Sequence, residues 1–329
     1  MKKGILLFFS VFVLYAYCSN HSQDQRSLPV QAEKTEEKNI HTSFNIEKAF
    51  LYDNQYTLPD SYPYQKGIRL FQWDKIRNGL ILLDSIQLKP AKYGILQNYK
   101  NSNGEALLVK KFLWDDYHLV IDTLGVERYQ SVPLYAMIDS VIPILYGRDG
   151  SLIKVTGETK KFLYAHPVYL KGNWMVPRKY VELIDDTVRF KKAIFIDRTN
   201  QNIATLEKVG STWMVRSMMP ATTGLHNPPY EHETPLGIFV IQQKKLQMLY
   251  DEDGTDEIAG YAPYANRFSG GAHIHGIPVN GDLDVKPPEY RPYLGTTPHS
   301  HECVRTVTSH AEFIYQWGPI NNTIVFVFD

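Results

Sequence analysis

Short apolar runs separated by turn-forming residues dominate this chain from about residue 46 onward. Stretches such as "YGILQNYKNSNGEALLVKKFLW" (93–114) and "LYGRDGSLIKVTGETKKFLYAHPVYL" (145–170) contain runs that are too short for stable helices. Asn and Gly tolerate positive φ, so "NSNG" (101–104) predicts a hairpin between the runs on either side of it. The pattern predicts a mainly β protein.

Composition limits the classes of partner. The 329 residues are 43% hydrophobic, which is enough for a substantial core in more than one domain. The 35 basic residues balance 35 acidic ones, so no field covering the whole molecule attracts nucleic acid. We therefore predict no nucleic-acid partner, and nothing in the sequence calls for a cofactor.

The first residues are typical of a targeting signal. Lys2 and Lys3 precede the apolar run "ILLFFSVFVLYAY", which is short for a bilayer span and suits a secretory signal over 1–18. The following "LYAYC" resembles the lipobox of bacterial lipoproteins, which implies acylation of Cys18, although Tyr17 stands where that pattern has a small residue. Ordinary cleavage and an uncleaved anchor are the alternatives. The expected location is the cell envelope, with a lipid anchor in a membrane and the protein facing the periplasm or cell wall.

Three further regions follow the signal. Residues 19–45 are polar and aperiodic, which predicts a flexible linker. Residues 46–186 are expected to form a β-rich N-terminal region, and its end "GNWMVPRKYVELI" (172–184) resembles the last strands of SH3-like domains. That resemblance implies an SH3-like or other small β-barrel module over about 135–185, with a 3₁₀ turn led by Pro177 before a closing strand. Such a module would position substrate, or would only pack on its neighbour.

The last part of the chain contains four distinctive segments. "IFIDRTNQNIATLEK" (194–208) predicts two strands joined at a polar turn, and "TPLGIFVI" (234–241) predicts a turn leading into a buried strand. "HIHGIP" (273–278) and "SHECVRT" (300–306) carry histidines and the cysteine. In this order the four segments resemble the L,D-transpeptidase catalytic domain of the YkuD type. The resemblance covers 187–329 and implies a β-sandwich catalytic domain.

The residues of the last two segments suggest thiol chemistry by themselves. With Cys18 lipidated or removed, Cys303 has no partner for a disulfide, and a free thiol needs a base or a cationic neighbour to act as a nucleophile. In an extended strand, His301, Cys303 and Arg305 project to one face. His273 and His275 share a face for the same reason, after two glycines.

The family resemblance assigns roles to these residues. It implies that Cys303 is the nucleophile and His275 the general base, with the imidazole oriented by the backbone carbonyl of Gly276. His301 and Arg305 match supporting and substrate-binding positions of the motif. His273 has no such counterpart.

Further assignments complete the predicted site. Ser300 opens the motif that contains the cysteine, and backbone N–H groups of 301–303 would form the oxyanion hole. Tyr264 is a candidate substrate contact, with core packing as the alternative. The stretch 282–299 is rich in Pro and Tyr and is expected to form a lid or one wall of the cleft, or else an ordinary surface loop.

One departure from the family pattern bears on activity. Glu302 stands where the family has Gly, so a positive φ there would be strained, and a carboxylate near the thiol would raise its pKa. If side chains alternate, Glu302 points away from Cys303.

The implied activity is acyl transfer through a thioester, from peptidoglycan stem peptides to an amine. Hydrolysis by water, which would make the protein an L,D-carboxypeptidase, is one alternative, and a non-catalytic peptidoglycan-binding protein is another. The four histidines and the thiolate of 273–303 also leave zinc open, although the usual spacings of zinc ligands are missing and no metal is predicted.

Overall fold

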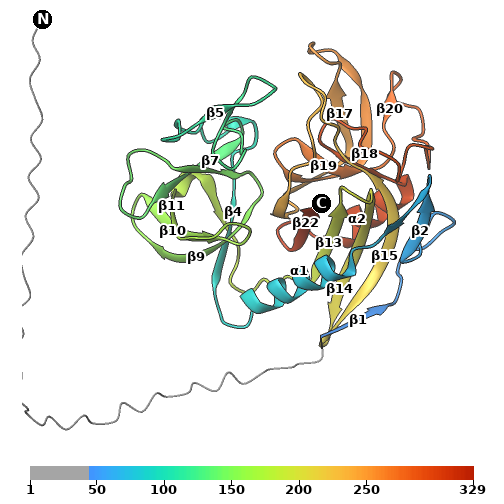
Figure 1. Ribbon diagram of the computed structural model, residues 1–329, viewed down its shortest axis with the longest axis horizontal. Helices are drawn as coiled ribbons and strands as arrows, with labels where there is room; N and C mark the ends of the chain where they lie inside the picture. The colour runs from blue at the N-terminus through green and yellow to red at the C-terminus, as the bar shows by residue number, and fades with distance from the viewer. Residues whose placement is uncertain (1–43) are drawn as a thin grey trace, which may run out of the picture. The chain divides into compact units, whose positions relative to one another are not determined.

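Two large β-sheets carry most of the strands that the computed structural model contains (Figure 1). The model describes residues 44–329. The predicted signal 1–18, its Cys18, and the linker as far as residue 43 lie outside the described residues. Within 44–329, no helix has the length and apolar character that a membrane span requires.

The larger sheet has 11 strands and contains the segments that resembled a catalytic domain. Its main path runs β16-β22-β13-β14-β15-β21-β19-β18-β17, while β1 pairs with β15 and β20 with β18. The strands are β1 (Asn45–Lys48), β13 (Lys192–Asp197), β14 (Asn202–Val209), β15 (Thr212–Thr222), β16 (Gly237–Val240), β17 (Gln243–Asp251), β18 (Ile258–Ser269), β19 (Ala272–His275), β20 (Val279–Asn280), β21 (Val304–Thr306) and β22 (Thr323–Phe328).

The local predictions for this sheet hold at its centre. β13 and β14 form the expected antiparallel pair around the polar turn, with Asp197 opposite Asn202. β16 pairs with β22 and helix α2 (Thr308–Trp317) connects β21 to β22. The chain is mainly β, as predicted, because its apolar residues alternate or cluster over strand lengths.

The smaller sheet has seven strands in the order β12-β4-β9-β10-β11-β7-β8. We call residues 92–184, which contain it, the β module. Its strands are β4 (Lys92–Leu96), β7 (Ser131–Ala136), β8 (Leu145–Arg148), β9 (Leu152–Glu158), β10 (Phe162–Pro167), β11 (Trp174–Pro177) and β12 (Val181–Leu183). Between β4 and β7 lie the 3₁₀ turn η1 (Tyr99–Asn101) and the strand pair β5 (Leu113–Trp114) and β6 (Val120–Ile121).

The end of the β module follows the prediction closely. A 3₁₀ turn, η2 (Arg178–Tyr180), comes directly after Pro177 and leads into β12. Tyr180 belongs to this turn and not to the closing strand. The SH3-like identity of the module stays a prediction.

The hairpin predicted at "NSNG" is wrong. β4 pairs with β9 and β12, and the run after Gly104 forms no strand before β5. The Asn98 side chain explains the difference, because its amide donates to the carbonyls of Gly104 at 3.1 Å and Ser131 at 2.8 Å. Side-chain hydrogen bonds therefore replace the strand ladder in this loop.

Residues 44–86 lie with the larger sheet, although the sequence placed them in a separate N-terminal region. β1 runs parallel to β15, and Asn45, assigned to the linker, is the first residue of β1. The hairpin of β2 (Ser61–Tyr64) and β3 (Gly67–Leu70) follows, and then helix α1 (Trp73–Ile86).

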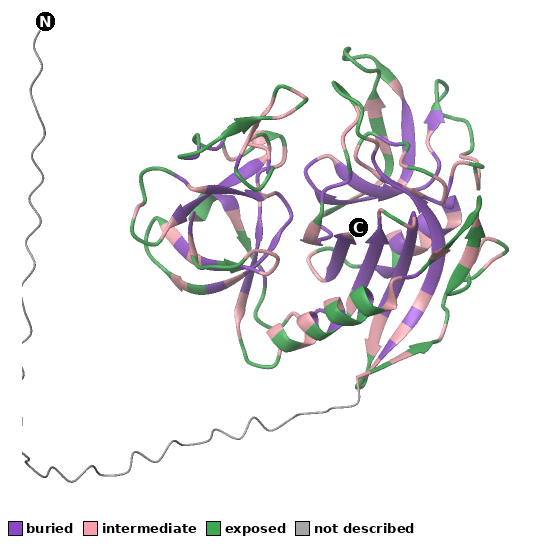
Figure 2. Ribbon diagram, viewed as in Figure 1, coloured by how far each residue is buried: buried purple, intermediate pink, exposed green. Residues whose placement is uncertain are grey.

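Helix α1 was not predicted, although its apolar spacing is helical. Ile76, Leu80 and Leu83 form one buried stripe, which packs in a common core with Phe195 and Phe326 of the larger sheet. Figure 2 shows the outer face of this helix exposed, over largely buried strands. Each fully buried side chain of this size contributes roughly 1.5–3 kcal/mol, so the helix is an integral part of the core.

Candidate active site

Two segments distant in sequence are neighbours at the centre of the larger sheet. β19 and β21 pair in parallel, with Ile274 opposite Val304 and His275 opposite Arg305. Directly paired residues project to the same face of a sheet. The sequence could not establish this proximity, which brings the "HIH" and "SHECVRT" segments together.

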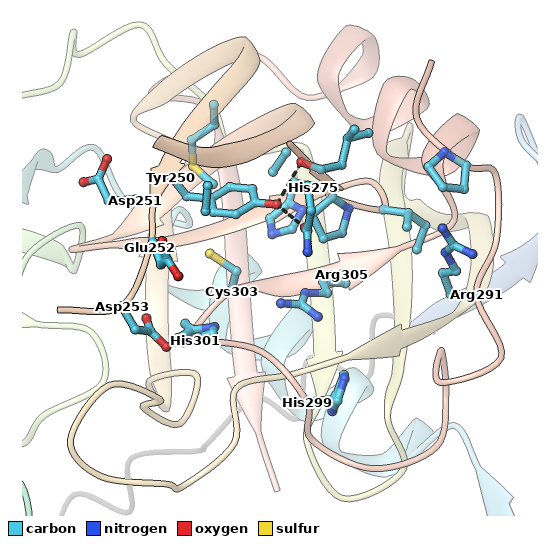
Figure 3. Close-up of a pocket in the computed structure, with 18 of the residues that line it drawn as sticks. Tyr250, Asp251, Glu252, Asp253, His275, Arg291, His299, His301, Cys303 and Arg305 are labelled. Carbon is cyan, nitrogen blue, oxygen red and sulfur yellow. Dashed lines mark hydrogen bonds and ion pairs between the residues drawn. The ribbon is translucent and has the colours of Figure 1, made fainter. Parts of the chain in front are cut away.

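A cavity of about 1250 Å³ opens over these strands. Four of the predicted residues line it: His275, His301, Cys303 and Arg305. Figure 3 shows their side chains around this one cavity, with Cys303 and Arg305 coming from the same segment. The structure therefore brings the candidate nucleophile and the candidate base into one site.

The His275 ring has the orientation that the family resemblance implied. Its Nδ1–H donates to the carbonyl of Gly276 at 2.6 Å, which fixes the tautomer and leaves Nε2 free to accept a proton. Burial lowers the pKa of His275 to about 3, and the nearby Arg305 guanidinium lowers it further in the same direction. The imidazole is therefore neutral before reaction.

The Cys303 thiol is also neutral, which differs from the activated thiolate expected from its sequence neighbours. Burial raises the pKa of Cys303 to about 12, and Glu302 contributes in the same direction, while contact with the His273 backbone and the Arg305 charge act against it. The Cys303 Sγ–H donates to the carbonyl of Gly271 at 3.6 Å. The positive charge of Arg305 alone does not offset the effect of burial on the pKa of the thiol.

The supporting residues of the motif occupy distinct positions. The Ser300 hydroxyl is buried and donates to the Cys303 carbonyl, so it holds the segment rather than facing the cavity. His301 is exposed at the rim, where its Nε2 lies 3.0 Å from the Asp253 carboxylate. The Arg305 guanidinium lies over the ring of Tyr293 at 5.7 Å.

Tyr264, a candidate substrate contact, and His273, which had no assigned role, lie outside the cavity lining. Tyr264 has a positive φ of 54° and packs edge-on against Tyr315 at 6.0 Å, so packing is the role that its contacts support. His273 is buried, and its Nδ1–H donates to the Gly271 carbonyl at 2.7 Å. Burial lowers the pKa of His273 to about 4, so this ring is neutral as well.

Glu302 adopts the conformation that a glycine favours. Its φ is 92°, in the left-handed region, and it is absent from the cavity lining that includes its neighbours His301 and Cys303. Both expectations for this position, a positive φ and a side chain directed away from the thiol's cavity, agree with the structure. Burial raises the pKa of Glu302 to about 8, with Glu127 acting in the same direction.

The sequence analysis missed one wall of the cavity. The end of β17 and the turn after it supply Asp251, Glu252 and Asp253. At the edge of this wall, the Tyr250 hydroxyl donates to the carbonyl of Val279 at 2.9 Å. The acidic run "DEDGTDE" (251–257) was the available signal. Such a run is ordinarily a solvated turn, so its place beside the cysteine had no signature along the chain.

The stretch 282–299 forms part of the cavity, which agrees with its predicted role as a lid or wall of the cleft. It contributes six lining residues: Val285, Lys286, Pro288, Arg291, Tyr293 and His299. Basic groups from this stretch and Arg305 therefore share the cavity with the acidic turn (Figure 3). A ligand that carries both an amine and a carboxylate fits these surroundings electrostatically.

The zinc alternative gains no support from side-chain placement. In the part of the chain from 44 to 329, no three or more His, Cys, Asp or Glu side chains are grouped so as to hold a metal ion. His301 pairs with Asp253, while the Nδ1 atoms of His273 and His275 are engaged by backbone carbonyls.

Comparison with known proteins gives one match to a family model. Residues 191–327 match the L,D-transpeptidase catalytic domain, YkuD. Comparison with curated proteins gives no match.

Several solved structures are similar to part of the chain. An L,D-transpeptidase from Mycobacterium smegmatis is 15% identical, over 55% of this chain and 93% of its own, with a TM-score of 0.35. One from Mycobacterium tuberculosis H37Rv is 20% identical, over 48% of this chain and 72% of its own, with a TM-score of 0.32. A fused Zn-dependent amidase/peptidase/peptidoglycan-binding domain-containing protein from Clostridium acetobutylicum is 20% identical, with a TM-score of 0.31. The similarity to it covers 43% of this chain and 53% of that protein, about half its length.

Proposed function

We propose, from the match of residues 191–327 to the L,D-transpeptidase catalytic domain, that this protein is a cysteine acyltransferase acting on peptidoglycan stem peptides. The observation that carries the proposal is the parallel pairing of β19 with β21, which puts His275 and Cys303 on one cavity. Nucleophile and base come from separate segments, and only the sheet joins them.

The neutral state of both groups defines the first step. His275 Nε2 accepts the thiol proton as Cys303 Sγ attacks the carbonyl carbon of an L-to-D peptide bond. A negative charge develops on the carbonyl oxygen, and backbone N–H groups near 301–303 are the donors proposed to stabilise it. Because the thiol and imidazole are uncharged beforehand, proton transfer accompanies attack.

Collapse of the intermediate breaks the C–N bond. The imidazolium of His275 returns its proton to the departing amine of the terminal D-residue, and a thioester on Cys303 remains. The amine of a second stem peptide, of a free D-amino acid or of a protein lysine then attacks the thioester, loses its proton to His275 and restores the thiol. Water in place of the amine gives the carboxypeptidase reaction.

The charges of the cavity support a peptide substrate of mixed charge. The Arg305 guanidinium is placed to bind a carboxylate in a two-pronged contact, and Arg291 and Lys286 line the same cavity. The acidic turn with Asp251 and Asp253 is available to an ammonium group. Peptidoglycan stem peptides carry both kinds of group.

The high pKa of the thiol favours a second candidate. A protein whose thiol has a pKa of about 12 could grip a stem peptide without cleaving it, and so serve as a non-catalytic wall-binding protein. The two candidates differ in whether a covalent thioester forms.

Mass spectrometry of a stem peptide incubated with the protein separates these candidates. We expect wild-type protein to release the terminal D-residue and to gain the mass of the acyl group, whereas Cys303→Ala does neither. Cys303→Ser is the matched control for shape, and we expect it to retain the fold with little turnover. Identical peptide spectra from wild type and Cys303→Ala would remove the enzyme proposal, and retained binding in both would then favour the wall-binding protein.

We also propose that the protein is exported and held at a membrane by a lipid on Cys18. The charged and apolar pattern of residues 1–18 is the support for this proposal. Mass analysis of the N-terminus of membrane-extracted protein tests it. An acylated Cys18 is expected, and an unmodified N-terminus ahead of residue 18 would overturn the proposal.

A further inference from the structure

The β module holds the turn that precedes β19. Asp149, which follows β8 and is 1% exposed, accepts from the Gly270 N–H at 3.1 Å and from the Arg267 guanidinium at 2.5 Å. At Gly150, a Cβ would lie 1.8 Å from the carbonyl oxygen of Phe268, so the backbones are in direct contact there. The position of the Gly270–Gly271 turn is therefore fixed from the module side.

The same turn contacts the nucleophile. The carbonyl of Gly271 accepts from the Cys303 thiol at 3.6 Å and from the His273 ring at 2.7 Å. A shift of this carbonyl would therefore change the direction of the thiol relative to the cavity.

Glu302 fills the space between the turn and the β module. Its backbone carbonyl accepts from the Thr234 hydroxyl at 2.7 Å. Its Oε2 lies 2.9 Å from the point where a Cβ on Gly271 would be, so the carboxyl rests against that glycine. The side chain thus contacts the turn that carries the partner of the thiol.

Charged groups from two sides face the Glu302 carboxyl. Glu127, Arg148 and Asp149 belong to the β module, and His232 belongs to the loop between β15 and β16. His232 Nδ1 lies 3.5 Å from the Glu127 carboxylate, and its ring stacks on Tyr117 of the module at 3.9 Å. The electrostatic surroundings of the carboxyl therefore depend on the position of the module.

The conformation of Glu302 is unfavourable unless its surroundings hold it. A residue with a Cβ at a φ of 92° is strained, and partial burial of a carboxyl is unfavourable as well. Glycine would avoid both costs at this position. The side chain must therefore be held by the contacts on either side of it.

We propose that Glu302 is a positioning residue, through which the β module sets the direction of the Cys303 thiol. The carboxyl lies against Gly271, and the thiol contacts the carbonyl of the same glycine. The inference rests on the proposed function only in taking Cys303 as the nucleophile.

The protonation state of Glu302 gives this role a measurable signature. With a pKa of about 8, the carboxyl is neutral at pH 7 and ionises above pH 8. Its charge then contributes to the raised pKa of Cys303, because like charges disfavour a second anion. Gln reproduces the neutral form, whereas Ala keeps the strained Cβ and removes the carboxyl.

The test measures the alkylation rate of Cys303 by iodoacetamide from pH 6 to 10, without any peptide. At pH 7, Glu302→Gln is expected to react like wild type, whereas Glu302→Ala differs by about tenfold or more, since a displaced thiol changes its accessibility and hydrogen bonding. Above pH 8 the wild-type rate is expected to rise less steeply than that of Glu302→Gln.

A change in the module distinguishes coupling from a local effect. Glu127→Gln removes one like charge and so lowers the pKa of Glu302. The pH at which the alkylation rate begins to rise less steeply, which we call the break, should therefore move to a lower value. The same change is expected to have no effect in a Glu302→Gln background. Glu158→Gln, an exposed module carboxylate paired with Arg178 at 2.6 Å, is the matched control.

Two outcomes would overturn the inference. The first is that folded Glu302→Ala and Glu302→Gln are alkylated at the same rate at pH 7. The second is that the alkylation rate of Glu302→Gln still begins to rise less steeply near pH 8. If Glu302→Ala does not fold, Glu302→Gly replaces it, since glycine accepts the backbone conformation. Alkylation needs no substrate, so its result stands even if no stem peptide is cleaved.

Discussion

At the scale of single residues, burial decides the chemical state of the site. Cys303 and His275 have the identities of a thiol and base pair, yet the pKa of the thiol is raised to about 12 and that of the imidazole lowered to about 3. Desolvation penalises both charged forms, and the one nearby guanidinium, on Arg305, does not reverse this. In the proposed reaction, the proton would therefore move from Cys303 to His275 during attack.

This protonation state predicts how the thiol responds to pH. The alkylation rate of Cys303 should continue to rise through pH 10 without a plateau, because the thiolate fraction keeps increasing below a pKa of about 12. A plateau with a midpoint below pH 8 would instead indicate a preformed ion pair with His275. The measurement is the pseudo-first-order rate of iodoacetamide labelling.

A substitution of the base separates reactivity from turnover. His275→Gln should lower acyl transfer by about 10²–10⁴-fold, the usual contribution of a general base. Labelling of Cys303 at pH 7 should change much less, because the imidazole is already neutral. His166→Gln, an exposed module histidine whose Nδ1 lies 2.7 Å from the Gly172 carbonyl, is the control and should alter neither quantity.

At the scale of elements, contacts of the β module with β16 and β18 join the two sheets. Besides the Asp149 contacts, the carbonyl of Gly150 accepts from the N–H of Val240 at 3.0 Å, and Ser151 forms an isolated bridge with Phe239. These are backbone contacts at a tight turn, so they leave no room for a side chain.

Two glycines of the module test the importance of that contact. Gly150→Ala should lower stability by about 3 kcal/mol or more, because strain at its φ of 83° adds to a backbone clash. Gly125→Ala, with a φ of 74° and open space around it, should lose only about 1–2 kcal/mol from the strain. Urea denaturation midpoints measure both, and equal losses would contradict the proposed closeness of the turn to β18.

At the scale of the whole molecule, buried neutral histidines link folding to pH. His273, His275 and His310 have pKa values lowered to about 4, 3 and 3, in each case mainly by burial. The ring of His310 lies between the hydroxyls of Ser217 at 2.8 Å and Thr306 at 3.0 Å. In the unfolded chain each ring would have its ordinary pKa.

This link predicts the direction of acid unfolding. Because the folded pKa values are depressed, the histidine contribution is fully present above the unfolded value of about 6.5 and is lost as pH falls. Each ring can add a slope of up to about 1.4 kcal/mol per pH unit between that value and its folded pKa. The urea denaturation midpoint should therefore decrease as the pH is lowered from 6.5 to 4.5. In His310→Gln this decrease should be smaller. An unchanged slope in His310→Gln would contradict the assignment.

Prediction from the sequence succeeded where covalent spacing carries the information. The sequence grouped His301, Cys303 and Arg305, which all line the cavity, although the extended strand expected for them begins only at Val304 and Glu302 has a φ of 92°. It failed where distant groups intervene, as at "NSNG", where Asn98 side-chain bonds replace the hairpin, and in helix α1, which packs on the larger sheet.

The sequence by itself determined the β class, because strand periodicity is a local property, and its motifs singled out Cys303 and His275 as the candidate nucleophile and base. Only the tertiary structure decided that β19 and β21 are neighbours, that the acidic turn forms a cavity wall, and that Glu302 rests between the β module and Gly271. It also decided the protonation states, since desolvation depends on what the whole fold packs around a group.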